Sequence, residues 1–166
     1  MTRDKNYILD QEVAARKLHR MALEIIENNL DESHIILAGI RESGSVIARN
    51  LQQLIASISG IKTQLITISL DKKNPGEITL SEQADFNDKV IVLVDDVANS
   101  GRTLLYALKP FLAFHPRKIQ TAILVSRSHN SFPVHADYVG LPVTTTRQEH
   151  IFVEVEGETV RGAYLQ

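Results

Sequence analysis

The sequence predicts an α/β protein with a mainly parallel central sheet and helices on both faces of that sheet. Short apolar runs alternate with segments of helical periodicity through the middle of the chain. Several of these runs are apolar at almost every position, which is typical of strands buried on both sides. The chain has 166 residues, 43% of them hydrophobic and 23% charged, so it is long enough to enclose a core. We expect one domain over residues 1–166.

The first half of the chain predicts two helices around a strand. From 13 to 26 the apolar residues fall at helical spacing, and Asp10 is a suitable N-cap for that helix. Residues 34–40, HIILAGI, have the length and composition of a buried strand. Residues 45–59 return to helical spacing, and we expect Gly60 to end that helix.

The next segment combines a strand with an unusually long irregular stretch. Residues 62–70 are rich in β-branched side chains, which favours a strand. Residues 71–87 are polar, contain Asn-Pro-Gly and show no periodicity. Irregular stretches of this length in a compact domain are usually functional. We expect a mobile loop at about 71–87.

The second half predicts one more helix and four strands. Residues 103–114 have helical composition, but Pro110 predicts a kink or break near Leu108. The expected strands are 90–94, 118–126, 136–140 and 150–156. Ligands of such sheets bind at the carboxyl ends of the strands.

Composition excludes several classes of protein. The net charge is −2 and the pI about 6.3, so no basic excess indicates a nucleic-acid partner. The chain has no cysteine, which excludes disulfides, thiolate catalysis and cysteine-based zinc sites. Its six histidines show no metal-ligand spacing. No signal peptide or membrane-spanning run is evident, so we expect a cytoplasmic protein without a membrane partner.

The stretch KVIVLVDDVANSGRTLLY, residues 89–106, carries the strongest chemical signal. Asp95 and Asp96 follow a buried strand, and a turn of small residues leads from them toward a helix. Hydroxyls of Ser100 and Thr103 and the charge of Arg102 suit a phosphate, since backbone N–H groups at such a turn also favour anions. Two carboxylates accept hydrogen bonds from vicinal hydroxyls or reach Mg²⁺ through water. The pattern therefore indicates a ribose phosphate, whereas simple capping of the turn would need no ligand.

This stretch closely resembles the phosphoribosyl-pyrophosphate (PRPP) motif of type I phosphoribosyltransferases. The segments ALEIIENN, IILAGIRESG, ILVSRSH and FPVHADYVGLPVTT also look like those of bacterial pyrimidine-operon regulators that act as uracil phosphoribosyltransferases. The resemblance implies a type I phosphoribosyltransferase fold with a small hood built from the terminal segments. It also implies a glycosyltransferase that makes a nucleoside monophosphate from PRPP and a free base, with Mg²⁺ as cofactor. Members of the family tend to form dimers or larger assemblies.

By the same resemblance, roles pass to individual residues. Asp95 and Asp96 are expected to meet the ribose hydroxyls as catalytic residues and, in part and indirectly, Mg²⁺. The residues expected to bind the 5′-phosphate are Asn99, Ser100, Gly101, Arg102 and Thr103. Those expected to bind the pyrophosphate are Arg41, Glu42, Ser43 and Gly44. Those expected to bind the base are Ser126, Arg127, Tyr138 and Val139. The 71–87 stretch resembles the loop that closes over the reacting sugar.

The choice of base stays open at this stage. Enzymes for hypoxanthine and guanine typically have an acid at the position of Asn99 and a lysine at that of Ser126, which argues against a 6-oxopurine. Pyrimidine regulators commonly have an aromatic residue at the position of Asn99 and an acid at that of Ser126, and this sequence has neither. Their counterpart of residues 71–87 is longer and contains an Arg-Asp run, which is also missing here. We expect uracil as the substrate, with a purine base as an alternative.

Three other hypotheses compete with this one. GIRESGSV has the outer glycine spacing of a P-loop but lacks its lysine. A phospho-acceptor domain would need a further aspartate and a lysine at later strand ends. A PRPP-sensing regulator that binds RNA is the main alternative, and Arg16, Lys17 and Arg20 are candidates for its basic face.

Overall fold

A six-stranded sheet forms the centre of the protein in the computed structural model, which describes residues 4–128, 130–144, 146 and 148–166. Its strands are β2 (His34–Ile40), β3 (Lys62–Ser69), β4 (Thr79–Leu80), β5 (Val90–Ala98), β6 (Lys118–Arg127) and β7 (Tyr138–Val143). They lie in the order β4-β3-β2-β5-β6-β7. All neighbours are parallel except β3 and β4. The predicted, mainly parallel sheet is confirmed.

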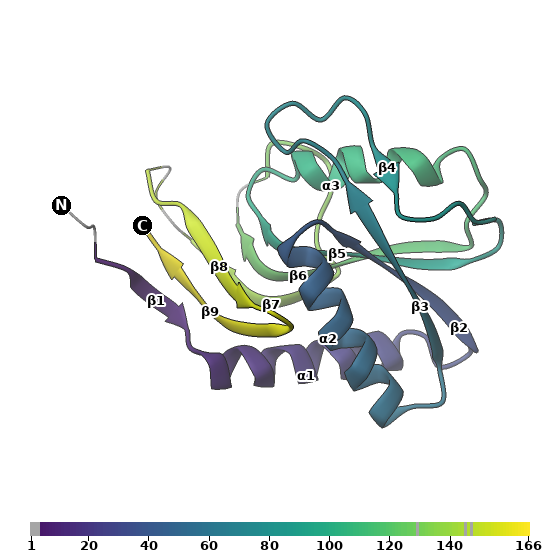
Figure 1. Cartoon of the computed structure of the whole chain (residues 1–166), viewed down its shortest axis with the longest axis horizontal. Coiled ribbons are helices and arrows are strands. Elements are labelled where there is room, and N and C mark those ends of the chain that lie inside the picture. Colours follow the sequence, from purple (N-terminus) through teal and green to yellow (C-terminus); the bar gives the residue numbers. More distant parts are fainter. Residues whose placement is uncertain (1–3, 129, 145, 147) are drawn as a thin grey trace.

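Helices cover both faces of this sheet (Figure 1). On one face lie α1 (Gln11–Glu27) and α2 (Ser43–Ile58), packed against one face of β2, β5 and β6. On the other lie α3 (Arg102–Ala107) and a 3₁₀ turn, η1 (Lys109–Phe111), in a second apolar cluster. The break predicted near Leu108 is confirmed, because α3 ends at Ala107 and the 3₁₀ turn follows.

The ends of the first two helices test two capping predictions. Asp10 caps α1 as predicted, since its Oδ1 accepts a hydrogen bond from the Val13 N–H at 2.8 Å. The prediction that Gly60 ends α2 is wrong. The helix ends at Ile58, and the backbone N–H and hydroxyl of Ser59 both donate to the Ile55 carbonyl. A serine hydroxyl satisfies the last turn without a left-handed glycine.

A second, three-stranded sheet lies beside the central one (Figure 1), and in it Asn6 pairs with Leu165. It contains β1 (Asn6–Leu9), β9 (Thr159–Leu165) and β8 (Ile151–Glu156), all antiparallel. Sequence periodicity predicts β8 but not β1 or β9. Its buried residues join the cluster that also contains α1 and α2, so the two sheets share one core. The edge strand β8 thereby faces the end of β5, with which it makes contact.

Residues 71–87 contain only β4 as regular structure. Near the end of this stretch, the buried Phe86 ring meets Phe111 and Phe114 edge-to-face, with centroids 4.9 and 5.2 Å apart. The mobility of the stretch stays a prediction. In the part of the chain that the structure describes, no helix is both long and apolar enough to cross a membrane.

Candidate functional site

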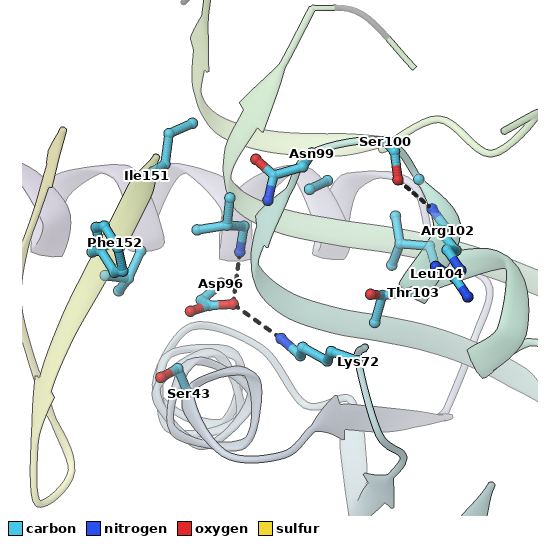
Figure 2. A pocket seen from close by; sticks show the side chains of 14 residues that line it. Ser43, Lys72, Asp96, Asn99, Ser100, Arg102, Thr103, Leu104, Ile151 and Phe152 are labelled. Atoms are coloured by element: carbon cyan, nitrogen blue, oxygen red, sulfur yellow. Dashed lines mark hydrogen bonds and ion pairs between the residues drawn. The ribbon is translucent and has the colours of Figure 1, made fainter. Parts of the chain in front are cut away.

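A cavity of about 550 Å³ lies between the end of β5 and the edge strand β8 (Figure 2). Its main wall is the continuous run Asp96–Leu104, which includes all five residues expected to bind the 5′-phosphate. Ser43 and Lys72 complete one side, and β8 supplies the opposite wall. The other lining residues are Ile151, Phe152 and Val153.

Two adjacent carboxylates near the end of β5 have different environments. β5 continues four residues beyond the predicted strand, because Val97 and Ala98 still pair with β6, and so both aspartates lie within it. The Asp95 side chain is 1% exposed and does not line the cavity, whereas Asp96 is 16% exposed and does. Asp95 Oδ1 accepts a hydrogen bond from the Asp96 N–H at 2.9 Å. Asp96 is therefore the carboxylate that a ligand can reach.

Lys72 ties the two carboxylates together. Its Nζ lies 3.2 and 3.3 Å from the two Asp95 carboxylate oxygens and 3.6 Å from Asp96 Oδ1. Burial lowers the pKa of Lys72, but the two carboxylates outweigh it and the pKa is raised above its ordinary value. Burial, together with repulsion from Asp96, raises the pKa of Asp95 well above its usual range, and Lys72 opposes that rise. The ammonium is thus the counter-charge of the acidic pair.

The loop between β5 and α3 is held in shape by its neighbours. Gly101 has φ of +85°, a left-handed conformation that favours glycine, and a Cβ there would lie 3.1 Å from the Val134 carbonyl. The Ser100 carbonyl accepts hydrogen bonds from the N–H groups of Ser131 and Phe132. Ser100 Oγ also accepts one from the Arg102 N–H at 3.3 Å. This local capping occurs within the cavity wall, so the loop is both fixed and accessible.

The 41–44 loop is divided between two clefts. Ser43 lines the cavity, and Gly44 packs so closely on β5 that a Cβ would lie 2.7 Å from the Val94 carbonyl. The side chains of Arg41 and Glu42 are 63% and 85% exposed and border a separate cleft instead. The structure brings Ser43 and Gly44 to the acidic pair but leaves the other two side chains outside the cavity.

The four residues expected at the base do not line this cavity. Tyr138 is buried against the α1 side, and its hydroxyl donates to Gln120 Oε1 at 2.8 Å. The Val139 carbonyl accepts a hydrogen bond from Arg20. Arg127 donates to the Glu149 carbonyl, and Ser126 pairs with Ala98 inside the sheet. These four residues therefore take part in packing, hydrogen bonding and strand pairing around the site.

Sequence analysis missed two contributors, Lys72 and the Ile151–Val153 segment. Lys72 lies in the stretch predicted to be a loop. Its place shortly after the end of β3 at Ser69 is the one signal that could have located it near the carboxyl edge of the sheet. Residues 151–153 were predicted as a strand with no role. No local pattern shows that a strand so late in the chain faces β5.

The side chains of the cavity can bind a metal ion only together with oxygens of a bound ligand. Among the described residues, no group of three or more histidine, aspartate or glutamate side chains could hold an ion. Asp96 is an accessible carboxylate, while Asp95 is buried and bound to Lys72. Mg²⁺ is often held by one or two carboxylates plus substrate oxygens, so the residues fit an ion that a phosphorylated substrate carries in.

Comparison with known proteins decides the family. The model of the phosphoribosyl transferase domain matches residues 5–157. The chain belongs to the phosphoribosyltransferase family. It is therefore an enzyme of the glycosyltransferase class, as its PRPP motif predicts. The sheet with helices on both faces is the type I fold of this family.

Relatives with similar sequences share one name. The chain is 37% identical over 163 residues to the Bifunctional protein PyrR of Clostridium acetobutylicum, with 92% of each chain covered. It is 37% identical over 168 residues to the protein of the same name from Clostridioides difficile, with 93% of this chain and 95% of the relative covered. The resemblance to pyrimidine-operon regulators is thus confirmed at the level of sequence.

Solved structures with the same fold include purine enzymes. A hypoxanthine-guanine phosphoribosyltransferase from Bacillus anthracis superposes with a TM-score of 0.76 at 18% identity, covering 97% of this chain and 98% of that one. The hypoxanthine phosphoribosyltransferase of Trypanosoma cruzi gives 0.79 at 13% identity, with 96% and 95% covered. At these identities the likeness shows the fold alone.

Proposed function

We propose that this protein transfers the phosphoribosyl group of PRPP to uracil, forming uridine monophosphate and pyrophosphate. The observation that carries the proposal is the cavity itself. An accessible carboxylate, Asp96, lines this cavity together with the hydroxyl and backbone donors of Ser100–Thr103. Strand β8 lies opposite both. PRPP needs an acceptor for ribose hydroxyls next to donors for the 5′-phosphate. The sequence similarity to PyrR proteins supports uracil over a purine.

In this mechanism the bond between ribose C1 and the pyrophosphate oxygen breaks, and its electron pair leaves with pyrophosphate. A ring nitrogen of uracil forms the new bond to C1, and its proton passes to solvent. Positive charge develops on the ribose ring during transfer. The Asp96 carboxylate accepts hydrogen bonds from the ribose hydroxyls and stabilises that charge from a fixed position. The buried Asp95 keeps Asp96 in place through its hydrogen bond to the Asp96 N–H.

Residues of the phosphate loop bind and orient the substrate. The hydroxyls of Ser100 and Thr103 and the backbone N–H groups around Gly101 are suited to the 5′-phosphate. Arg102 supplies positive charge beside them. Because the loop is held by residues 131–134, its donors do not have to reorganise when PRPP binds.

We assign the base to the β8 side of the cavity, with Asn99 at its border. In the described part of the chain, β8 pairs only with β9, so backbone groups on its other edge are free to hydrogen-bond a ligand. Uracil presents alternating N–H and C=O groups, which match such an edge. Tyr138 does not enter this assignment because its hydroxyl already donates to Gln120.

Magnesium enters this proposal as an ion bound together with PRPP. Asp96 would share it with substrate oxygens, and it would neutralise charge on the leaving pyrophosphate. We also propose that residues 71–87 close over the site, that the protein is cytoplasmic and that it assembles into dimers. Light scattering during size-exclusion chromatography tests the assembly.

The test incubates the protein with PRPP, magnesium chloride and one of uracil, cytosine, hypoxanthine, guanine or adenine, and follows pyrophosphate release. We expect release with uracil and none above background with the other bases. Release with a purine alone would contradict the uracil assignment, and release without any base would indicate PRPP hydrolysis.

A PRPP-sensing regulator that binds RNA is the second candidate, and the similarity to pyrimidine-operon regulators favours it. The first helix gives it limited support. Arg20 donates to the carbonyls of Val139 and Gly140 and pairs with Glu24. Arg16 is exposed but lies 4.0 Å from Glu12, and Lys17 is half-buried. RNA binding through such charges weakens steeply with salt. Absence of binding to pyrimidine-operon leader RNA at low salt would contradict this candidate.

A further inference from the structure

We propose that Lys72 is a catalytic residue that contacts the leaving pyrophosphate, and that the buried Asp95 is the residue that positions it. This inference rests on the proposed function and assigns a role within the same site. Lys72 stands in the 71–87 stretch, outside both the PRPP motif and the 41–44 loop.

The two carboxylates divide their tasks by burial. Asp95 is 1% exposed and absent from the cavity lining, so a substrate in the cavity does not meet it. Both of its carboxylate oxygens instead lie within 3.3 Å of the Lys72 ammonium. A buried carboxylate that contacts a lysine through both oxygens fixes the position of that lysine.

The Lys72 ammonium remains available to a ligand. Its side chain is 43% exposed and lines the cavity together with Asp96 and Ser43 (Figure 2). An ammonium has three N–H donors. Two serve the Asp95 oxygens, at 3.2 and 3.3 Å. Asp96 Oδ1 lies 3.6 Å away as an ion pair, so the third N–H can be donated to an anion in the cavity.

The position of the ammonium indicates which anion it meets. A Cβ at Gly44 would lie 3.0 Å from Asp95 Oδ1, the oxygen that also lies 3.2 Å from the Lys72 Nζ. The ammonium and the first turn of α2 therefore approach the same oxygen. Ser43 at that turn lines the cavity with Lys72, and residues 41–44 are the segment expected to hold the pyrophosphate. The lysine charge is thus placed on the side where pyrophosphate departs and gains negative charge.

The test measures binding by calorimetry for inorganic pyrophosphate, PRPP and ribose 5-phosphate, each with magnesium chloride at the same concentration. For Lys72→Met we expect the Kd of pyrophosphate and of PRPP to rise about tenfold or more, since a charged hydrogen bond is lost. The Kd of ribose 5-phosphate should change by less than about twofold, because that ligand lacks the pyrophosphate. Lys72→Arg should retain most of the affinity.

Lys62→Met is the matched control, because it removes the same charge from an exposed residue at the start of β3, outside the cavity and the 71–87 stretch. It should leave all three Kd values unchanged. Equal weakening of all three ligands by Lys72→Met, or weakening of ribose 5-phosphate alone, would overturn the inference.

A second variant separates binding from folding, because Lys72→Met leaves Asp95 buried without its counter-charge. The double variant Lys72→Met with Asp95→Asn removes both charges. Its pyrophosphate affinity should stay low, and recovery to the wild-type value would mean that Lys72 only neutralises Asp95. Wild-type protein that fails to bind PRPP would instead refute the proposed function, so the two failures are distinguishable.

Discussion

The two walls of the cavity are built in different ways. The wall from Asp96 to Leu104 is one continuous stretch at the end of β5, and each residue takes its place from the local strand–loop–helix path. The opposite wall is β8, an edge strand of a sheet formed by segments near both ends of the chain. In the proposed function the first wall binds ribose and phosphate, and the second wall binds the base.

This difference explains why one half of the site is recognisable from sequence and the other is not. Chemistry on the PRPP side depends on adjacent residues, so it leaves a motif. Chemistry on the base side depends on which residues of β8 meet the end of β5, and this follows from the packing of β8 against α2 and β5. Changes to the two walls should therefore have separable effects.

The largest effect is expected on the continuous wall, for Asp96→Asn. The variant keeps the shape of the side chain but removes the charge that we propose stabilises the ribose ring, so kcat/KM for PRPP should fall about 100-fold or more. Steady-state pyrophosphate release measures it. Asp31→Asn, an exposed aspartate outside the cavity, is the control. Full activity in Asp96→Asn would remove Asp96 from the mechanism.

Gly44→Ala should disturb the same wall, because Gly44 packs against β5. The added Cβ would lie 2.7 Å from the Val94 carbonyl and 3.0 Å from Asp95 Cα, and backbone cannot yield as a flexible side chain does. We expect a loss of about 1–3 kcal/mol in the free energy of unfolding, measured with urea. The KM for PRPP should also rise.

The control for this change is Gly76→Ala, since no atom lies within 4 Å of the Cβ it would add. Equal stability of both variants would show that the 41–44 loop is not packed against β5 as described.

Phe152→Ala should affect the second wall alone. Phe152 lines the cavity and is 44% exposed, and its ring stacks on Tyr164 with centroids 5.3 Å apart. We expect the KM for uracil to rise about three- to tenfold, from lost aromatic contact, with an unchanged KM for PRPP. Tyr7→Ala removes the other ring that contacts Tyr164 but lies outside the cavity, and it should leave both values unchanged. A rise in the PRPP KM alone would contradict the division between the walls.

The smallest kinetic effect is expected for Tyr138→Phe, which tests whether Tyr138 contacts the base. Both KM values should stay the same, because the hydroxyl is used inside the protein. A higher KM for uracil in this variant would indicate that the Tyr138 hydroxyl contacts the base.

Alkaline stability reports on the same hydroxyl. Burial raises the pKa of Tyr138 to about 12, above the ordinary value of 10.0. A raised pKa in the folded state means that this contribution to stability is complete below pH 10 and is lost as the pH rises toward 12. Urea titrations across that range should show a smaller alkaline loss in Tyr138→Phe.

The sequence by itself determined the central sheet except its edge strand β4, the helices on its faces, the break near Leu108 and the PRPP motif. These features depend on residues close together in the chain, through periodicity, capping and turn chemistry. It missed β1 and β9, because short terminal strands have a weak pattern and gain their stability from pairing with each other. It also could not distinguish the two aspartates, which look equivalent in DDV.

Only the tertiary structure decided that Asp95 is buried while Asp96 is accessible, that Lys72 joins them, and that β8 closes the cavity. Burial of a carboxylate depends on what packs around it, here the first turn of α2 and a lysine from the segment after β3. Such contacts link residues far apart in the chain, and local patterns carry no record of them. The motif therefore identifies the substrate that this enzyme shares with its family, and the packing of distant segments determines how the site is charged and closed.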